Sequence, residues 1–379
     1  MADRETEVLA RIASGVSALD AAQWDALAGW HPFVSSAFLT ALEDSGSVGP
    51  GTGWTPAPLL IEGDHEKLVA AAPAYLKTHS QGEYVFDHVW ADAWERAGGA
   101  YYPKLQIAVP FTPVPGPRLL GWRSQQLLAA AEAVTLQSDL SSAHVTFLEQ
   151  PDAAEAEARG WLIRQGLQYH WFNRGYGSFE DFLCLLSSRK RKAIRKERAA
   201  ARKGLEFRAL RGTEIGAAEW DAMWRFYQDT GSRKWGHPYL TRSFFDLIGE
   251  RMGDGLLLFL ASRDGSPIAG ALNVIGPDSL YGRYWGTIEE VRFLHFELSY
   301  YQAIEWAIEN GLQSVQAGAQ GEHKLARGYE PVITRSAHFI PNASFRRAVE
   351  NFLAEERAAV AAEAEWCRQQ LPYRSSESE

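Results

Sequence analysis

The sequence has little of what marks secreted, zinc-binding or membrane-spanning proteins. It contains two cysteines, Cys184 and Cys367, which lie far apart and belong to no Cys/His cluster. Neither a disulfide scaffold nor a zinc site is therefore expected. No apolar run approaches the length of a membrane-spanning helix, and the N-terminus lacks the basic and apolar segments of a secretory signal. These absences predict a cytoplasmic protein, with any membrane contact at the inner face of the membrane.

The sequence also lacks the motifs of several large enzyme classes. A metalloprotease H-E-x-x-H, a P-loop and a G-x-S-x-G nucleophile elbow are all missing. The glycine-rich stretch 49–53 is followed by prolines and not by a helix, which indicates a loop. A net charge of −9 argues against general nucleic-acid binding as the main activity.

What the chain does have is length and aromatic side chains. Its 379 residues suffice for two domains, and 46% hydrophobic residues suffice for a full core. Fourteen Trp and fourteen Tyr suit pockets or grooves, because each combines a large apolar body with a polar group. An aromatic-rich core without a ligand gives the same composition.

Hydrophobic periodicity predicts alternating helices and strands. Helices are expected at 37–45, 91–96, 124–137, 154–165, 179–202, 220–229, 242–251, 296–309 and 345–370. Strands are expected at 57–62, 68–75, 83–87, 105–111, 144–148, 167–172, 206–210, 256–262, 269–275, 280–285 and 314–317. Each half reads as a meander of strands, then a helix, then a strand. We therefore predict an α/β protein with mixed sheets and two domains, residues 1–170 and 171–379.

Several stretches resemble one bacterial protein family. They are residues 75–87, 101–105, 109–118, 280–286, 293–298 and 317–329. Together they resemble the Fem-like "peptidoglycan biosynthesis/recognition" proteins of the GNAT superfamily. The resemblance implies tandem GNAT-like domains and acyl transfer to an amine, with aminoacyl-tRNA or acyl thioesters as donors. It implies no tightly bound cofactor and no metal, since the acyl donor is a co-substrate.

The loop 320–329 stands where Fem-type transferases carry a Phe-Lys pair and a Gly-aromatic pair. Here the pairs are His323-Lys324 and Gly328-Tyr329, and the His in place of Phe departs from the family pattern. An amine that attacks a carbonyl must lose a proton, so Glu322 or His323 could act as general base. Lys324 could stabilise an oxyanion or hold a phosphate, with Gln320 and Arg327 as further contacts. A solvated charged turn is the alternative.

Further residues of the second half are candidates for catalysis or substrate binding, because they lie near the start of the helix 296–309 or on the strand 280–285. Glu297 at the start of the helix 296–309 is a third catalytic candidate, although the helix dipole alone favours a carboxylate there. Possible substrate contacts nearby are His295, Tyr301, Arg283, Tyr284 and Trp285. The aromatic residues on either face of the strand 280–285 could equally belong to the core.

In the first half, His79, Glu83, Asp87 and Lys104 are polar residues among apolar and aromatic ones. They could bind substrate. Equally, they could form buried structural pairs, an interpretation that we favour for Lys104 with Asp87.

A basic helix is expected within 183–203. Between Arg189 and Lys203 there are nine Lys or Arg and one Glu. The residues expected to bind an anion are Arg189, Lys190, Arg191, Lys192 and Arg195. Candidate partners are a tRNA acceptor end, an acyl carrier protein, CoA phosphates, a lipid-linked pyrophosphate or an anionic membrane surface. The alternative is that these charges only form a solvated face of the helix. The resemblance implies that this helix is a shorter counterpart of the helical arm of Fem proteins.

The GNAT loop that cradles the CoA pyrophosphate is not evident. Residues 96–101 only approximate Q/R-x-x-G-x-G/A, and they end a helix instead of opening one. The leading hypothesis is an N-acyltransferase that acts on an amine of a cell-envelope precursor. The alternatives are N-acylation of a lipid or small-molecule amine from acyl-CoA or acyl carrier protein, and a non-catalytic module that binds envelope fragments.

Overall fold

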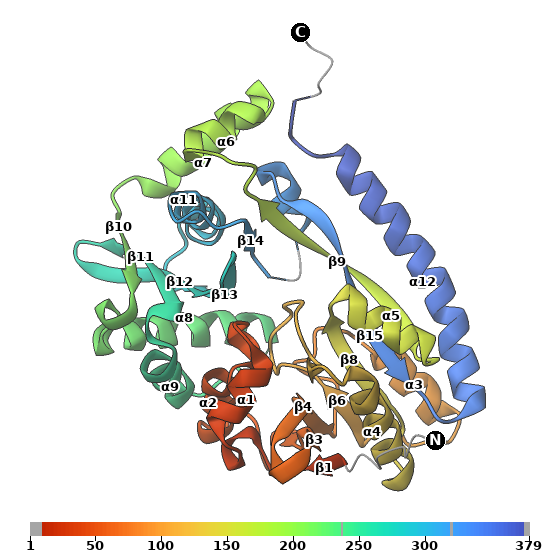
Figure 1. Ribbon diagram of the computed structural model, residues 1–379. Helices are drawn as coiled ribbons and strands as arrows, with labels where there is room; N and C mark the ends of the chain where they lie inside the picture. The colour runs from red at the N-terminus through yellow and green to blue at the C-terminus, as the bar shows by residue number, and fades with distance from the viewer. Residues whose placement is uncertain (1–9, 236–237, 319–320, 375–379) are drawn as a thin grey trace. The chain divides into compact units, whose positions relative to one another are not determined.

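The computed structural model describes residues 10–235, 238–318 and 321–374. The chain divides into two compact units (Figure 1). One comprises Met1–Gly166 with Thr334–Ala359, and the other comprises Leu167–Ile333 with Val360–Glu379. The chain leaves the first unit close to residue 170, but it also returns to that unit near its C-terminus, which a division into 1–170 and 171–379 does not include.

The first unit holds two sets of strands. The smaller is an antiparallel sheet in the order β1-β3-β4-β7. The larger set runs β15-β8-β6-β5-β2, antiparallel except for the parallel pair β6 and β8. The strands are β1 (Ala10–Ile12), β2 (Trp54–Pro56), β3 (Leu59–Glu62), β4 (Leu68–Ala72), β5 (Ala74–Lys77), β6 (Lys104–Ile107), β7 (Leu120–Gly121), β8 (Ala143–Leu148) and β15 (Glu330–Phe339).

Helices connect and cover these strands. They are α1 (Ala21–Ala28), α2 (Ser36–Asp44), α3 (His88–Arg96), α4 (Ser124–Gln137), α5 (Gln150–Ala158) and the start of α12 (Ala343–Gln369). Asp20 and Ser35 cap α1 and α2 through side-chain bonds to backbone N–H groups, which satisfies donors that a helix start leaves open. The main core joins Leu105 and Val145 of the parallel strands to Leu127 of α4.

The second unit is one mixed sheet with helices. Its strand order is β10-β11-β12-β13-β14-β9, and only β13 and β14 are parallel. The strands are β9 (Leu162–Phe172), β10 (Glu206–Arg211), β11 (Leu256–Arg263), β12 (Ser266–Ile275), β13 (Ser279–Thr287) and β14 (Ser314–Gln316). Asp264 and Gly265 both have positive φ in the β11–β12 turn, which matches the twist of a tight hairpin.

The helices of the second unit include the predicted basic helix. They are α6 (Phe179–Leu185), α7 (Ser188–Arg202), α8 (Ala217–Trp235), α9 (Arg242–Met252), α10 (Leu294–Phe296) and α11 (Gln302–Glu309). Thr241 caps α9 by accepting from the Phe244 N–H, as predicted. A π-helical turn, Glu297–Tyr301, joins α10 to α11.

Both units repeat one arrangement, as the sequence pattern predicts. Antiparallel strands lead to a parallel pair that is joined through a helix: β6, α4 and β8 in the first unit, and β13, α11 and β14 in the second. An antiparallel strand then flanks the second member of each pair. The mixed α/β architecture is confirmed, and in the described part of the chain no helix is long and apolar enough to cross a membrane.

Four local predictions were wrong in instructive ways. Residues 83–87 form no strand, because their carboxylates turn inward to buried lysines. The predicted helix 154–165 ends at Ala158, and its last residues begin β9. The predicted helix 179–202 is broken at Leu186, whose extended backbone ends α6. The predicted strand 68–75 is two strands, β4 and β5, which are separated at Pro73 and belong to different sheets.

Candidate functional site

The loop that carries the predicted catalytic residues follows β14 in the second unit. Because β14 is parallel to β13, the loop lies at the carboxyl end of a parallel pair, the edge at which open α/β sheets bind ligands. A 3-10 helix, Glu322–Arg327, forms most of it, while Gln320 lies outside the described residues. Gly328 ends this helix with φ of 86°, and a Cβ there would lie 2.8 Å from Cζ of Phe182, so only glycine fits.

Lys324 is the most unusual residue of the loop. Its side chain is 1% exposed, and Nζ donates a hydrogen bond to the Gly318 carbonyl oxygen at 2.7 Å. Within the described residues it forms no ion pair with a carboxylate. Burial lowers the pKa of Lys324 from its usual 10.5 to about 7. A buried amine that is close to half-protonated at neutral pH is therefore present at the ligand-binding edge of the sheet.

The buried side chain of His170 and the half-buried side chain of Gln316 share this environment. His170 of β9 lies opposite Gln316 of β14 in the antiparallel register. Burial, and then the charge of Lys324, lower the pKa of His170 to about 3, so its ring is neutral. The Oε1 atom of Gln316 is buried without a hydrogen-bond partner in the described part of the chain. Neither residue was among the predicted site residues.

Arg327 anchors the loop. Its Nη1 donates to the His323 carbonyl at 2.7 Å, its Nε donates to the Tyr301 hydroxyl at 3.0 Å, and its Nη2 pairs with Glu197 at 2.8 Å. The guanidinium also lies 3.5 Å from the centre of the Phe296 ring. Arg327 is thus a structural part of the site that fixes where His323 and Lys324 lie.

The two predicted bases of the loop are exposed. Glu322 and His323 are both at the surface. His323 Nε2 is 2.9 Å from the Tyr300 hydroxyl, and its ring packs beside Phe296 at 5.5 Å between centroids. The His323 ring is held by its neighbours yet reaches solvent. The Glu322 carboxylate forms no hydrogen bond or ion pair with the described residues that would orient it toward a substrate.

Glu297, the third catalytic candidate, is fully buried in ion pairs. Arg198 donates to both of its carboxylate oxygens, at 3.1 and 3.0 Å, and Arg202 Nε donates to Oε1 at 2.7 Å. Because guanidinium groups occupy both oxygens, neither can take a proton from a substrate. We assign Glu297 a structural role: it joins α7 to the π-helical turn.

The aromatic candidates divide between the loop and the core. His295 packs at 5.1 Å from Trp285 and at 6.3 Å from His323, so this group adjoins the loop. Tyr301, fully buried, bonds Glu197 and Arg327 and belongs to the anchor of the loop.

The remaining two candidates of β13 lie elsewhere. Tyr284 packs edge-on against Phe245 and Tyr227 of α9 and α8, which makes it a core residue. Arg283 is the extra residue of a β-bulge, since Gly282 and Tyr284 face consecutive residues of β12.

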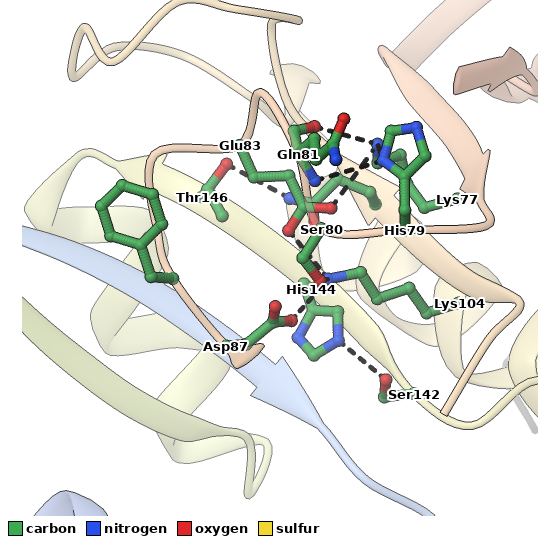
Figure 2. Close-up of polar contacts among 12 residues, drawn as sticks. Lys77, His79, Ser80, Gln81, Glu83, Asp87, Lys104, Ser142, His144 and Thr146 are labelled. Atoms are coloured by element: carbon green, nitrogen blue, oxygen red, sulfur yellow. Dashed lines mark hydrogen bonds and ion pairs between the residues drawn. The ribbon is translucent and has the colours of Figure 1, made fainter. Parts of the chain in front are cut away.

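The candidates of the first unit form a buried polar cluster (Figure 2). Lys104, fully buried at the start of β6, donates to Asp87 at 2.5 Å, to Glu83 at 2.8 Å and to the Ser80 hydroxyl at 3.0 Å. The pair of Lys104 with Asp87 is therefore confirmed. Figure 2 shows both carboxylates turned toward the Lys104 ammonium group. His79 lies at the margin of the cluster, where Nε2 is 3.0 Å from the Thr52 carbonyl.

A second buried lysine completes the cluster. Lys77 Nζ lies 3.8 Å from Glu83 and 3.7 Å from the centre of the Trp54 ring. Burial lowers the pKa of Lys77 to about 7 and raises the pKa of Glu83 to about 7. Burial alone would raise the pKa of Asp87, but the charge of Lys104 outweighs it and holds that pKa below its usual value.

This cluster has the character of a structural network. Tyr101 donates to Asp87 at 2.6 Å, and His144 continues the network to His338 with 2.7 Å between their Nδ1 atoms. It lies at the amino ends of the parallel strands β6 and β8, the end opposite to the one where such sheets bind ligands. Three members of the cluster were not predicted, since each lies in an ordinary strand or loop pattern: Lys77, Tyr101 and His144.

Comparison with protein families identifies the chain. The pattern of the FemAB-like family, described as peptidoglycan biosynthesis/recognition, matches residues 15–375. The chain belongs to the FemAB-like family. No curated protein matches its sequence.

Solved structures agree on the fold of this FemAB-like protein. The crystal structure of FemX is similar with a TM-score of 0.55 at 14% identity, over 88% of this chain and 98% of FemX. A conserved protein of unknown function from Bacteroides thetaiotaomicron VPI-5482 gives 0.52 at 10% identity, over 88% and 99% of the two chains. A tandem GNAT protein from the clavulanic acid biosynthesis pathway gives 0.43 at 12% identity, over 88% and 98%. The predicted Fem-like, mixed α/β fold is confirmed by the family match and by the similarity to FemX.

The basic helix of the FemAB-like chain is α7. Its predicted anion-binding residues differ in their exposure to solvent. Arg189, Lys192 and Arg195 are exposed, while Lys190 and Arg191 are half-buried. Arg195 pairs with Glu180. Among the described residues no group of His, Cys, Asp or Glu is arranged to hold a metal ion.

Proposed function

We propose that this FemAB-like protein transfers an acyl or aminoacyl group to an amine of a cell-envelope precursor, and that the second unit carries the reaction. The observation that carries the proposal is Lys324: a buried cation without a carboxylate partner in the described residues, at the carboxyl end of the parallel pair β13 and β14. An unpaired charge is costly to bury, so its retention at this edge favours a functional role.

The chemistry assigned to the loop is aminolysis. The acceptor nitrogen attacks the carbonyl carbon of the donor, a C–N bond forms, and the bond from that carbon to the leaving sulfur or oxygen breaks. Lys324, in its ammonium form, donates to the carbonyl oxygen, where negative charge develops. His323 accepts the proton that the amine loses and returns it to the leaving atom.

The surrounding contacts suit these two roles. The Tyr300 hydroxyl holds the His323 ring, and Arg327 holds the His323 carbonyl, so the base is ordered although it is exposed. Glu322 stays an alternative base that the geometry favours less.

The test is an acyl-transfer assay with the full chain and its Lys324→Met, His323→Ala and Glu322→Gln variants. Removing an oxyanion donor should lower kcat about 100- to 1,000-fold, and removing the base about 100-fold or more. Glu322→Gln should keep most of the activity. Full activity in Lys324→Met would refute the assignment, and binding of envelope fragments without turnover in any variant would point to a non-catalytic module.

A further inference from the structure

The helix α7 has two faces of different character. Ile194 and Ala201 are buried on its inner face. From the same side Arg198 reaches Glu297, and Glu197 reaches Arg327 of the catalytic loop. The inner face therefore fixes α7 to the loop that presents Lys324, and Figure 1 shows α7 alongside α11.

The outer face carries a stripe of cations. Arg189, Lys192 and Lys196 are spaced by three and four residues, which places them on one side of α7, opposite Ile194 and Ala201, and Lys203 follows directly after the last residue of the helix. All four are exposed, and none forms an ion pair with a carboxylate of the described residues. We call these four residues the outer stripe.

Small side chains separate the cations of the outer stripe. Ala193, Ala199 and Ala200 are exposed on the same side of α7. Small residues let a second helix approach closely, and lysines three or four residues apart match carboxylates at the same spacing on that helix. The surface thus fits an acidic helix.

Two other anionic partners fit this surface less well. An amphipathic membrane helix needs an apolar face toward the bilayer, but the apolar face of α7 is buried in the protein. Single-stranded nucleic acid is held by exposed aromatic rings together with cations, and α7 contains no aromatic residue.

We propose that the outer stripe docks an acidic helix of a carrier protein that delivers the acyl group as a thioester. The inference rests on the proposed acyl transfer and names its donor. Docking on α7 places the carrier on the helix that holds the Lys324 loop through Glu197 and Arg327.

The experiment measures binding of a fluorescent bacterial acyl carrier protein, acylated through its phosphopantetheine, to the full chain by anisotropy. Saturable binding that weakens with salt is expected, together with about tenfold or greater loss of affinity in Lys192→Glu/Lys196→Glu. The matched control is Lys67→Glu/Arg96→Glu, which changes the net charge equally at exposed positions of the first unit and should bind as the wild type. Lys192→Ala/Lys196→Ala repeats the test with residues that favour a helix, in case the charge reversal impairs folding.

Three outcomes would overturn the proposal: no saturable binding, an equal loss in the control, or stripe-dependent binding of total tRNA or of phosphatidylglycerol vesicles in place of the carrier. The Lys324→Met variant separates this inference from the proposed function. Carrier binding that persists in Lys324→Met without transfer supports the docking surface and the catalytic role together. Transfer that depends on Lys324 in the absence of carrier binding would leave the proposed function standing and refute the docking surface.

Discussion

Replacing Lys324 by Met gives the sharpest test, because one substitution changes both stability and activity. Burial lowers the pKa of Lys324 from 10.5 to about 7 in the folded protein. The folded state therefore favours the neutral amine. Its contribution to stability is complete above pH 10.5, where the unfolded chain is also neutral, and is lost as the pH falls toward 7.

The magnitude follows from the size of the shift. A lowering of the pKa from 10.5 to about 7 corresponds to about 5 kcal/mol between these pH values, or about 1.4 kcal/mol per pH unit. Methionine has a similar length and no charge to bury. The free energy of unfolding of Lys324→Met minus that of the wild type should therefore rise by about 1.4 kcal/mol for each unit by which the pH falls from 10 to 7.

Urea unfolding of both proteins at several pH values between 7 and 10 measures this difference. Lys67→Met, at an exposed position, is the control and should show a difference that does not change with pH. A constant difference for Lys324→Met would refute the reasoning, because it would mean that an anion or solvent stabilises the ammonium group in the folded state. A variant that is more stable at pH 7 but inactive is the pattern expected of a site that trades stability for function.

Four further predictions follow from the same contacts. Arg327→Lys should lower kcat about a hundredfold through a displaced loop while the protein stays folded, as steady-state kinetics with circular dichroism would show. Glu297→Ala should cost about 2–3 kcal/mol of stability in urea unfolding, because Arg198 and Arg202 lose their fully buried partner and keep only the half-buried Glu305. A loss of activity at unchanged stability would instead restore Glu297 as a catalytic candidate. Asp87→Asn should destabilise to a similar extent by weakening the pairing of buried Lys104, without a specific effect on kcat at temperatures where the variant is folded. Burial raises the pKa of Glu83 from 4.5 to about 7, so its stabilising contribution is complete below pH 4.5 and lost as the pH rises through 7; Glu83→Gln should gain stability relative to the wild type over that range.

Much of the fold could be predicted because its signals are local. The hairpin turn at Asp264-Gly265, the cap at Thr241 and the helix 124–137 each depend on residues within one turn or one periodic stretch. The return of Thr334–Ala359 to the first unit could not be predicted in this way, since it depends on the partner strand β8 almost two hundred residues earlier in the chain.

The candidate site shows the same division. The position of Lys324 on a loop after a strand was evident. That no carboxylate of the described residues pairs with it depends on the whole fold and could not be predicted. The pairing of Glu297 with Arg198 and Arg202 joins segments about a hundred residues apart, and no spacing in the sequence indicates it. Charge and position in the sequence therefore give candidate residues, but they do not show which of these residues already have ion-pair partners in the fold.

The two units place their buried lysines at opposite ends of the same arrangement. In the first unit, Lys104 stands at the amino end of the parallel pair and is surrounded by Asp87 and Glu83. In the second unit, Lys324 follows the carboxyl end of the corresponding pair, and among the described residues its ammonium group bonds only the Gly318 carbonyl oxygen. A lysine whose charge is already balanced by carboxylates gains little from a substrate. A lysine that bonds only one backbone carbonyl gains a strong interaction when the carbonyl oxygen of a bound substrate becomes negative. The repeated fold thus supplies two equivalent positions for a site, and the distribution of buried charge favours the second unit for the chemistry and the first for stability.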